Sequence, residues 1–285
     1  NPPQSEYVSP RWQSRNWISG FTGSAGTVVI TMDKALIWVD SRYFVQCADQ
    51  IKGTPFIRKK VDGPEASSPN SFLAETFSQG QKVGIAAETL MVSSKAKYLE
   101  LNINIQAMDD LLDNIWTDRP AMPTNAVVQL DDELCGKSVE EKINSVRELG
   151  NKNNEQYHLV SSLAEIAWLL NLRGSDIDDT PVFLAHLLIG PDFVKLFTPK
   201  ERFASINVES LPYEVLPYEA ITEQLATLKD ATVRLNPARI NMKLKNSLDK
   251  ACNVKLSEGR EYSTDLKAAK NEAELEGMRI AHILD

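Results

Sequence analysis

Three evenly spaced glycines, Gly20, Gly23 and Gly26, are the first feature of the sequence that could carry chemistry, because glycine-rich turns can bind phosphates. A dinucleotide-binding turn needs the spacing G-x-G-x-x-G between a strand and a helix, so that the phosphates meet the helix N-terminus. Here the spacing is G-x-x-G-x-x-G, a β-branched run at 27–31 follows, and the stretch contains no G-K-S or G-K-T. This order favours a turn in which glycine permits positive φ and close packing where the chain enters a sheet.

Side chains that could act as nucleophiles are poorly placed. Ser24, in the string G-S-A-G, precedes a strand, whereas the nucleophile elbow G-x-S-x-G joins a strand to a helix. Cys47 falls on the expected apolar face of a helix, which favours a buried and inert thiol; the other residues of that face are Phe44, Ala48 and Ile51. The sequence offers no Ser-His-Asp or Cys-His arrangement, and we expect this chain by itself to be catalytically inactive.

Metal-binding patterns are absent from the sequence. The histidines His158, His186 and His282 are far apart, and no H-E-x-x-H occurs. We interpret His158, in a strand pattern, and His186, in a hairpin, as structural or surface residues, and His282 as solvated. Neighbouring carboxylates in a strand point to opposite faces, so adjacent aspartates do not form a joint metal site, and we predict no metal ligand here. The adjacent pairs are interpreted as turn or helix-start residues: Asp109-Asp110, Asp131-Asp132 and Asp178-Asp179.

Two arginines remain as candidate site residues. Arg42 lies in the string DSRYF, at the first turn of an expected helix that Asp40 or Ser41 can cap. A cation at that end opposes the helix dipole and needs a partner, either Asp40 or another carboxylate in a local pair, or a group at the active site. Arg173 begins the turn RGSD at 173–176, which is either a self-contained Asp-Arg turn or a turn that presents the arginine at a domain junction.

The composition indicates a soluble globular protein. The 285 residues suggest about two domains, and 42% hydrophobic and 25% charged residues are ordinary values. The net charge of -8 argues against nucleic-acid binding, and no stretch approaches the roughly 20 apolar residues that cross a bilayer. The three cysteines, Cys47, Cys135 and Cys252, do not suggest a disulfide framework. We therefore expect a cytoplasmic protein that binds neither nucleic acid nor membranes.

The elements that would position these residues alternate between strands and helices, which predicts an α/β fold. The string TDRPAMP at 117–123 reads as a linker between two domains, because two prolines follow a helix. Before it we expect strands at 27–31, 36–39, 81–86 and 103–108. The helices expected there are one that begins at residue 40 or 41 and others at 71–77, 93–101 and 111–116. After it we expect strands at 126–130, 182–189, 193–197, 214–216 and 232–235, and a further strand that ends near residue 160. The helices expected there are at 138–149, 163–170, 221–228 and 244–251. Capping boxes are expected at Ser138 with Glu141 and at Ser162 with Glu165.

The two ends of the chain suggest a segment of a longer protein. The sequence has no initiator methionine, and a helical pattern from Glu272 to Asp285 stops without a C-cap.

Several strings together resemble the Xaa-Pro aminopeptidase (aminopeptidase P) family. SGFTGSAGT and WVDSRYF resemble its first domain, and NIWTDRP fits the end of that domain. EIAWLLNLRGSDI, followed by PVF, is similar to the most characteristic string of its second domain, although Ala164 and Thr180 depart from the residues usual there. LKAAKNEAELEGMRIAHILD resembles the first helix of the third, catalytic domain. The resemblance covers nearly the whole chain in the right order.

The resemblance implies two tandem creatinase N-terminal-like domains, each a mixed sheet flanked by helices. They would occupy 1–120, without its first strand and helix, and 124–262; residues 263–285 would be the first helix of a missing catalytic domain. It implies a metallopeptidase that releases the N-terminal residue preceding proline, so the substrates are peptides with proline at the second position. In that family two divalent metals, usually manganese, activate the attacking hydroxide in the pita-bread catalytic domain, and none of their ligands maps onto this chain.

For this region the resemblance implies that it shapes access to the active site and supports a homodimer. Arg42 would reach toward the active site across a domain or subunit boundary, and Arg173 is the second residue expected to contribute there. A hypothesis from another class is a peptidase-like module that has lost catalysis and binds protein; the state of the metal ligands beyond residue 285 separates the two. A prolidase or creatinase is disfavoured, because those carry one N-terminal domain.

Overall fold

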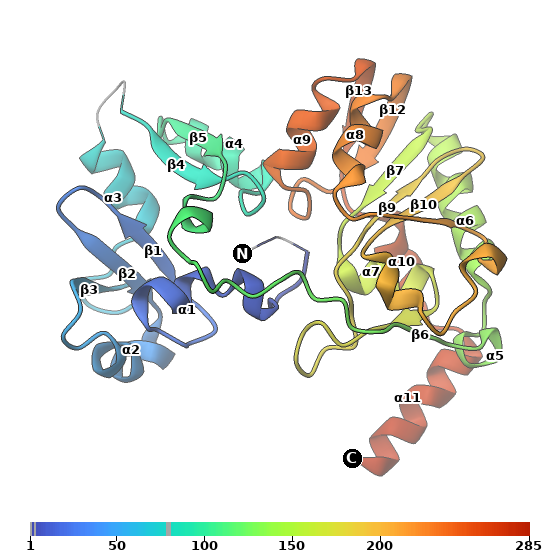
Figure 1. Cartoon of the computed structure of the whole chain (residues 1–285), viewed down its shortest axis with the longest axis horizontal. Helices are drawn as coiled ribbons and strands as arrows, with labels where there is room; N and C mark the ends of the chain where they lie inside the picture. Colours follow the sequence, from blue (N-terminus) through green and yellow to red (C-terminus); the bar gives the residue numbers. More distant parts are fainter. Residues whose placement is uncertain (1, 3, 78–80) are drawn as a thin grey trace. The chain divides into compact units, whose positions relative to one another are not determined.

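The computed structural model describes residues 2, 4–77 and 81–285, and contacts divide the chain into two compact units. Unit 1 comprises Pro10–Ala87 and Ser93–Ala121, and unit 2 comprises Pro2–Ser9, Glu88–Val92 and Met122–Asp285. Each unit contains strands and helices, as Figure 1 shows with colours that follow the chain. The expected α/β class, with sheets flanked by helices, is confirmed.

Unit 1 contains a sheet in the order β1-β2-β3 and a separate pair, β4-β5. β1 (Thr27–Ile30) and β2 (Ala35–Val39) form an antiparallel hairpin, and β3 (Phe56–Lys60) joins β2 in parallel. β4 (Val83–Ala86) and β5 (Ile105–Met108) are parallel. The helical elements along this part of the chain are η1 (Pro10–Trp12), α1 (Ser14–Ser19), η2 (Ser41–Tyr43), α2 (Phe44–Gln50), α3 (Pro69–Thr76), α4 (Val92–Glu100) and η3 (Leu111–Asn114).

The helix after β2 buries part of the face that the sequence predicts. Cys47 and Ile51 are buried with Phe21 in a core of unit 1, and burial raises the pKa of the Cys47 thiol. Ala48, expected on the same face, is exposed. It lies about 100° around the helix from Cys47, so the buried stripe is narrower than expected.

Unit 2 is built on a mixed sheet in the order β11-β10-β9-β7-β12-β13. β9 (His186–Ile189) and β10 (Val194–Phe197) form the expected antiparallel hairpin. β7 (Tyr157–Val160), β12 (Lys229–Leu235) and β13 (Cys252–Glu258) run parallel to one another, and β11 (Glu214–Leu216) runs parallel to β10. A short antiparallel pair completes the unit: β6 (Val128–Gln129) and β8 (Leu172–Arg173).

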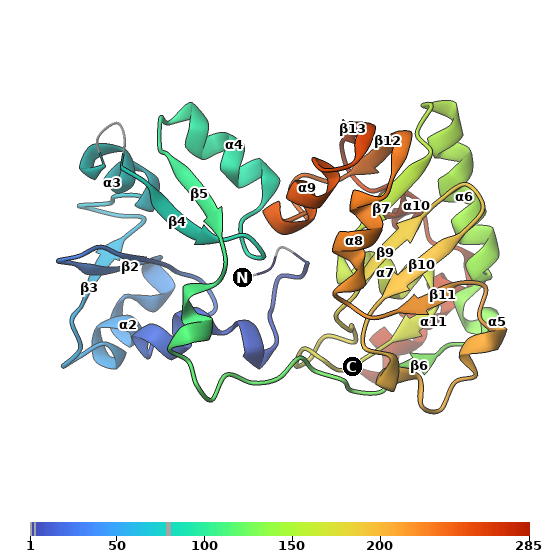
Figure 2. The ribbon, with the colours of Figure 1, turned by 45° about the horizontal axis from the view of Figure 1, so that its top comes forward.

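Helices cover both faces of this sheet (Figure 2). Leu187 and Ile189 point to the face covered by α6 (Val139–Lys152), α7 (Leu163–Leu169) and α10 (Tyr262–Ala268). Leu159 and Leu188 point to the face covered by α8 (Ala220–Ala226) and α9 (Met242–Leu248). The remaining helical elements are α5 (Asp132–Cys135), η4 (Lys200–Phe203), η5 (Val208–Ser210) and α11 (Glu272–Leu284).

One of the two expected capping boxes is present in unit 2. In α6, Glu141 N donates to Ser138 Oγ at 3.2 Å and Ser138 N donates to Glu141 Oε2 at 2.7 Å. The box expected at the start of α7 is wrong, because Ser162 makes no side-chain cap and Glu165 pairs with Lys267 at 2.7 Å. Instead, Leu163 N donates to the carbonyl of Gln4 at 3.0 Å. A distant segment of the chain therefore provides the hydrogen-bond acceptor for a backbone N–H group in the first turn of α7.

The helix expected from Glu272 is α11. It begins with a capping box in which Glu274 N donates to Asn271 Oδ1 at 2.9 Å. Residues 266–268 of the string that resembles one continuous helix belong instead to α10. The first turn of α11 is fixed to unit 2, since Trp168 Nε1 donates to Glu274 Oε1 at 2.7 Å.

Gly150 gives a test of close packing in unit 2. A Cβ on Gly150 would lie 2.2 Å from His158 Nε2 and 3.0 Å from the Glu155 carbonyl. We expect Gly150→Ala to destabilise unit 2 by about 1–3 kcal/mol, because the imidazole or the helix must move. The matched control is Gly277→Ala in α11, where no atom lies within 4 Å and about 0.5–1 kcal/mol of stabilisation is expected from helix propensity. Urea unfolding followed by circular dichroism checks both variants, and equal midpoints would contradict the expectation.

Candidate functional site

The structure brings the glycine-rich turn against the start of α2. Ser24 Oγ and Tyr43 OH are hydrogen-bonded at 2.7 Å, although the two residues are nineteen positions apart. At the other end of α2, Gln50 Nε2 donates to Thr22 Oγ1 at 2.8 Å, so the turn contacts both ends of the helix. Two features that the sequence leaves separate, the glycine string and Arg42, therefore meet. We refer to Ser24, Asp40, Arg42 and Tyr43 as the Arg42 cluster.

The Arg15 side chain donates hydrogen bonds to backbone carbonyl groups of the glycine-rich turn. Its Nη1 donates to the Gly26 carbonyl at 2.9 Å and its Nη2 donates to the Gly23 carbonyl. The guanidinium lies 5.5 Å from the centre of the Phe21 ring, and burial lowers the pKa of Arg15. A phosphate site would need N–H groups directed at the ligand, whereas this turn directs oxygens at a cation of its own chain. The prediction against phosphate binding agrees with this geometry.

Two of the glycines show the two uses of glycine that the sequence predicts. Gly20 ends α1 with φ 73°, in the left-handed region. A Cβ on Gly23 would lie 2.2 Å from the Phe21 ring and 2.8 Å from the Tyr43 ring. Gly23 therefore makes room for the edge-to-face pair of Phe21 and Tyr43, whose ring centres are 5.6 Å apart.

Arg42 forms the local pair that was one of its two predicted alternatives. Its Nε and Nη2 donate to the two carboxylate oxygens of Asp40, each at 2.9 Å, and its backbone N–H donates to Asp40 Oδ1 at 3.1 Å. The guanidinium also lies 5.1 Å from the centre of the Tyr43 ring. The hydrogen bond from the Arg42 side chain lowers the pKa of Asp40. The Arg42 side chain is nevertheless 66% exposed, so this pair lies on the surface of unit 1.

Arg173 has partners other than the expected one. Its Nη1 donates to the carbonyls of Leu172 at 2.8 Å and Ala167 at 3.2 Å, next to its position in β8. The self-contained Asp-Arg turn is wrong, because Asp176 pairs with Arg202 instead. The local spacing misleads here, since a buried carboxylate pairs with the cation that is buried with it.

Sequence reasoning missed Arg202, a buried cation with several hydrogen-bond acceptors. Its Nη2 lies 2.7 Å from Asp176 Oδ2, and its Nη1 donates to Asp176 Oδ1 at 2.8 Å and to the Asn125 carbonyl at 3.1 Å. The side chains of Arg202 and Asp176 are both 0% exposed. Asp176 also accepts a hydrogen bond from Leu184 N at 2.8 Å. Arg202 stands among charged residues in the string KERF, so no local pattern marks it as buried.

Two of the three histidines are buried in the sheet of unit 2, and the third is exposed. His158 in β7 is buried, and burial lowers its pKa to about 4. His186 in β9 is buried on the opposite face of the sheet, and burial lowers its pKa to about 3. His186 Nδ1 is hydrogen-bonded to Ser161 Oγ at 2.7 Å, and its ring packs on Tyr218. His282 is exposed on α11.

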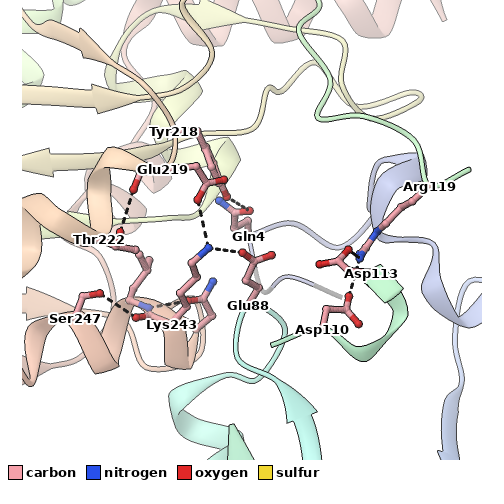
Figure 3. Close-up of polar contacts among 12 residues, drawn as sticks. Gln4, Glu88, Asp110, Asp113, Arg119, Tyr218, Glu219, Thr222, Lys243 and Ser247 are labelled. Carbon is pink, nitrogen blue, oxygen red and sulfur yellow. Dashed lines mark hydrogen bonds and ion pairs between the residues drawn. The ribbon is translucent and has the colours of Figure 1, made fainter. Parts of the chain in front are cut away.

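The adjacent aspartates also have the predicted local roles. Asp110 caps η3 by accepting from Leu112 N at 3.1 Å, and it pairs with Arg119 at 2.9 Å (Figure 3). Asp131 stands at the N-cap of α5, and Asp179 lies in a turn with φ 55°. Among the residues that the structure describes, no group of three or more His, Cys, Asp or Glu side chains is placed to hold a metal ion.

A polar group around Lys243 fixes the segment Glu88–Val92 within unit 2. Lys243 Nζ lies 2.5 Å from Glu88 Oε1 and 3.3 Å from Glu219 Oε2, as Figure 3 shows. Two backbone bonds reinforce it: Met242 N donates to the Leu90 carbonyl at 2.8 Å, and Val92 N donates to the Ile240 carbonyl at 3.0 Å. We interpret this group as structural. A lysine that is ion-paired with two carboxylates is held as a cation, and a cationic amine is not a nucleophile.

Comparison with known proteins assigns the two halves of the chain to one family. Two family models, both described as Creatinase/Prolidase N-terminal domain, match the chain: one covers residues 7–115 and the other covers residues 118–274. A protein named probable Xaa-Pro aminopeptidase P from Ajellomyces dermatitidis is 36% identical over an alignment of 303 positions, gaps included, which covers 99% of this chain and 49% of the relative. Its namesake from Coprinopsis cinerea is 40% identical over 200 residues, which cover 68% of this chain and 32% of that protein. The chain thus spans about a third to a half of the length of these relatives.

A solved structure shows the same fold. The X-prolyl aminopeptidase from Caenorhabditis elegans, described as a cytosolic enzyme with a di-nuclear active site, superposes with a TM-score of 0.86 at 24% identity. The match covers 98% of this chain and 48% of that one. Within the described ranges, no helix of this chain is both long and apolar enough to span a membrane.

Proposed function

The chain belongs to the creatinase/prolidase N-terminal domain family, and we propose that it is the non-catalytic N-terminal region of an Xaa-Pro aminopeptidase, a metallopeptidase that releases the residue preceding proline. The observation that carries the proposal is the match to Xaa-Pro aminopeptidase P over 99% of this chain, with two N-terminal domains in tandem. The substrates would be peptides with proline at the second position. The domain limits that we propose are 1–120, 124–262 and, for the first helix of the catalytic domain, 263–285.

The catalytic metals would belong to another part of the protein. We propose two divalent ions, with manganese as their identity; the C. elegans enzyme is described as di-nuclear. The described residues of this chain do not fit such a site, because their carboxylates and imidazoles are dispersed and engaged in caps, turns and ion pairs. The chain alone is therefore expected to be inactive.

The role that we propose for this region is to shape access to the active site and to support a homodimer. Arg42 would position the substrate or the catalytic domain, which its exposed place on unit 1 permits. We propose Arg173 as a second contributor there, although its Nη1 already donates to the backbone carbonyls of Leu172 and Ala167 within unit 2. A cytoplasmic location fits the three free cysteines, Cys47, Cys135 and Cys252.

The proposal predicts a metal-dependent activity for the complete gene product. We expect it to release the first residue of a peptide with proline at the second position when manganese is present, to lose this activity with a chelator, and to regain it when the metal returns. The matched substrate has alanine in place of proline and should remain uncleaved. The 285-residue chain alone serves as the inactive control. A well-folded complete protein that cleaves neither peptide would favour the protein-binding module instead.

A further inference from the structure

Three groups in the Arg42 cluster act on the Arg42 guanidinium or on its support. Asp40 holds one edge of the guanidinium, Nε and Nη2, with both carboxylate oxygens, which fixes the plane of the fork. The Tyr43 ring lies 5.1 Å from the guanidinium carbon. Ser24 in turn holds Tyr43, through the bond of 2.7 Å between the two hydroxyl oxygens.

Tyr43 is itself fixed from a second side. Its ring packs edge-to-face on Phe21, which is fully buried, and the absence of a side chain at Gly23 makes that contact possible. The hydrogen bond with Ser24 lowers the pKa of Tyr43. A chain of contacts thus runs from the core of unit 1, through Phe21 and Tyr43, to an arginine at the surface.

Fold stability does not explain this arrangement. An ion pair as exposed as Arg42 with Asp40 contributes little to stability, because water and salt screen it. An exposed arginine also loses side-chain entropy when it is held in one orientation. The contacts of Asp40 and Tyr43 with an exposed guanidinium, and the bond of Ser24 to Tyr43, are therefore more simply explained by a need for orientation than by a need for stability.

We propose that Asp40 and Tyr43 are positioning residues for Arg42, with Ser24 fixing the Tyr43 ring, so that the guanidinium meets an oxygen acceptor of the peptide substrate in one orientation. The inference rests on the proposed function, since it concerns the same substrate. The acceptor is a carbonyl or carboxylate oxygen, because a guanidinium offers only N–H donors. The glycine-rich string thereby gains a purpose: it places Ser24 beside Tyr43 and leaves room for Phe21.

The test uses the complete enzyme, a tripeptide with proline at the second position, and a double-mutant cycle. We expect Arg42→Ala to lower kcat/KM about 10- to 100-fold, the range for loss of a charge-assisted hydrogen bond. We expect Asp40→Asn and Tyr43→Phe each to lower it by several-fold up to about 10-fold, because Arg42 is then less well oriented. In the Arg42→Ala background neither change should lower kcat/KM further, since a positioning residue acts through the residue it positions.

Two controls separate positioning from stability. Asp265→Asn removes a carboxylate from the surface pair of Arg260 and Asp265, at 3.2 Å in unit 2, in which the arginine is about as exposed as Arg42, and should leave kcat/KM unchanged. The thermal midpoint of each cluster variant should stay near that of the wild type.

Each contrary outcome has its own meaning. If the wild type does not cleave the tripeptide, the proposed function fails. If Arg42→Ala is as active as the wild type, the role of Arg42 fails and the inference with it. If Arg42→Ala is impaired while Asp40→Asn and Tyr43→Phe are not, or if their losses add to that of Arg42→Ala, Arg42 keeps its role and the positioning inference is overturned.

Discussion

Replacing Arg202 with methionine is expected to destabilise unit 2 by about 3–5 kcal/mol, the cost of leaving a buried carboxylate without its partner. The Asp176 side chain is 0% exposed and makes two bonds with Arg202, at 2.7 and 2.8 Å. Methionine fills part of the volume of the arginine but neutralises no charge. The carbonyls of Asn125 and Pro123 also lose a donor, which adds to the loss.

The matched control is Arg260→Met, in a pair whose side chains are 67% and 69% exposed. We expect that variant to lose at most about 1 kcal/mol, because water already screens the pair. Urea unfolding of both variants gives the comparison, with Arg202→Met/Asp176→Leu as a third variant that removes both charges. We expect the double variant to recover part of the loss, and similar midpoints for Arg202→Met and Arg260→Met would refute the account.

Lowering the pH from 7.5 to 5 is expected to destabilise unit 2 by about 2 kcal/mol for each of His158 and His186, about 4 kcal/mol together. In the folded chain burial lowers the pKa of His158 to about 4 and that of His186 to about 3, from 6.5. Below pH 6.5 the unfolded chain therefore binds protons that the folded chain does not. Stability is complete above pH 6.5 and is lost as the pH falls toward 4 and 3.

The free energy of unfolding, measured in urea at several pH values, checks this prediction. The variant His186→Asn keeps a polar side chain beside Ser161 and does not titrate, so we expect it to lose about half of the pH dependence. The control His282→Asn changes an exposed histidine on α11 and should leave the pH dependence as it is. A pH dependence that is the same in His186→Asn and in the wild type would show that another group is responsible.

Elements with strong apolar patterns were predictable from the sequence. The hairpin of β9 and β10 and the capping box of α6 were both predicted, because their signals lie within a few residues. β3 and β13 were not predicted. Their strings, FIRKK and CNVKLSE, carry lysines and few apolar residues, and each strand lies at the edge of its sheet, so pairing with one neighbour decides its conformation.

In the candidate site, too, local contacts were predictable from the sequence and distant contacts were not. Arg42 and its pairing with Asp40 lie within three residues, so the sequence was enough to propose both. Ser24, which stands nineteen residues before Tyr43, could not be connected with it from the sequence. The wrong capping box at Ser162 and the wrong pair of Arg173 with Asp176 have a common cause: Gln4, Lys267 and Arg202, all distant in sequence, provide the actual contacts.

The sequence by itself determined the family and the α/β class, because long strings such as SGFTGSAGT and EIAWLLNLRGSDI and the local patterns of apolar residues carry that information. The order of elements, which is local, also favoured a strand entry over a phosphate site for the glycine string. Only the tertiary structure decided which charges are buried together and that the glycine string supports the Arg42 cluster. The physical reason is that a hydrogen bond or ion pair depends on distance in space. Folding brings polar atoms within about 3 Å of each other, and the separation of their residues along the chain does not predict this contact.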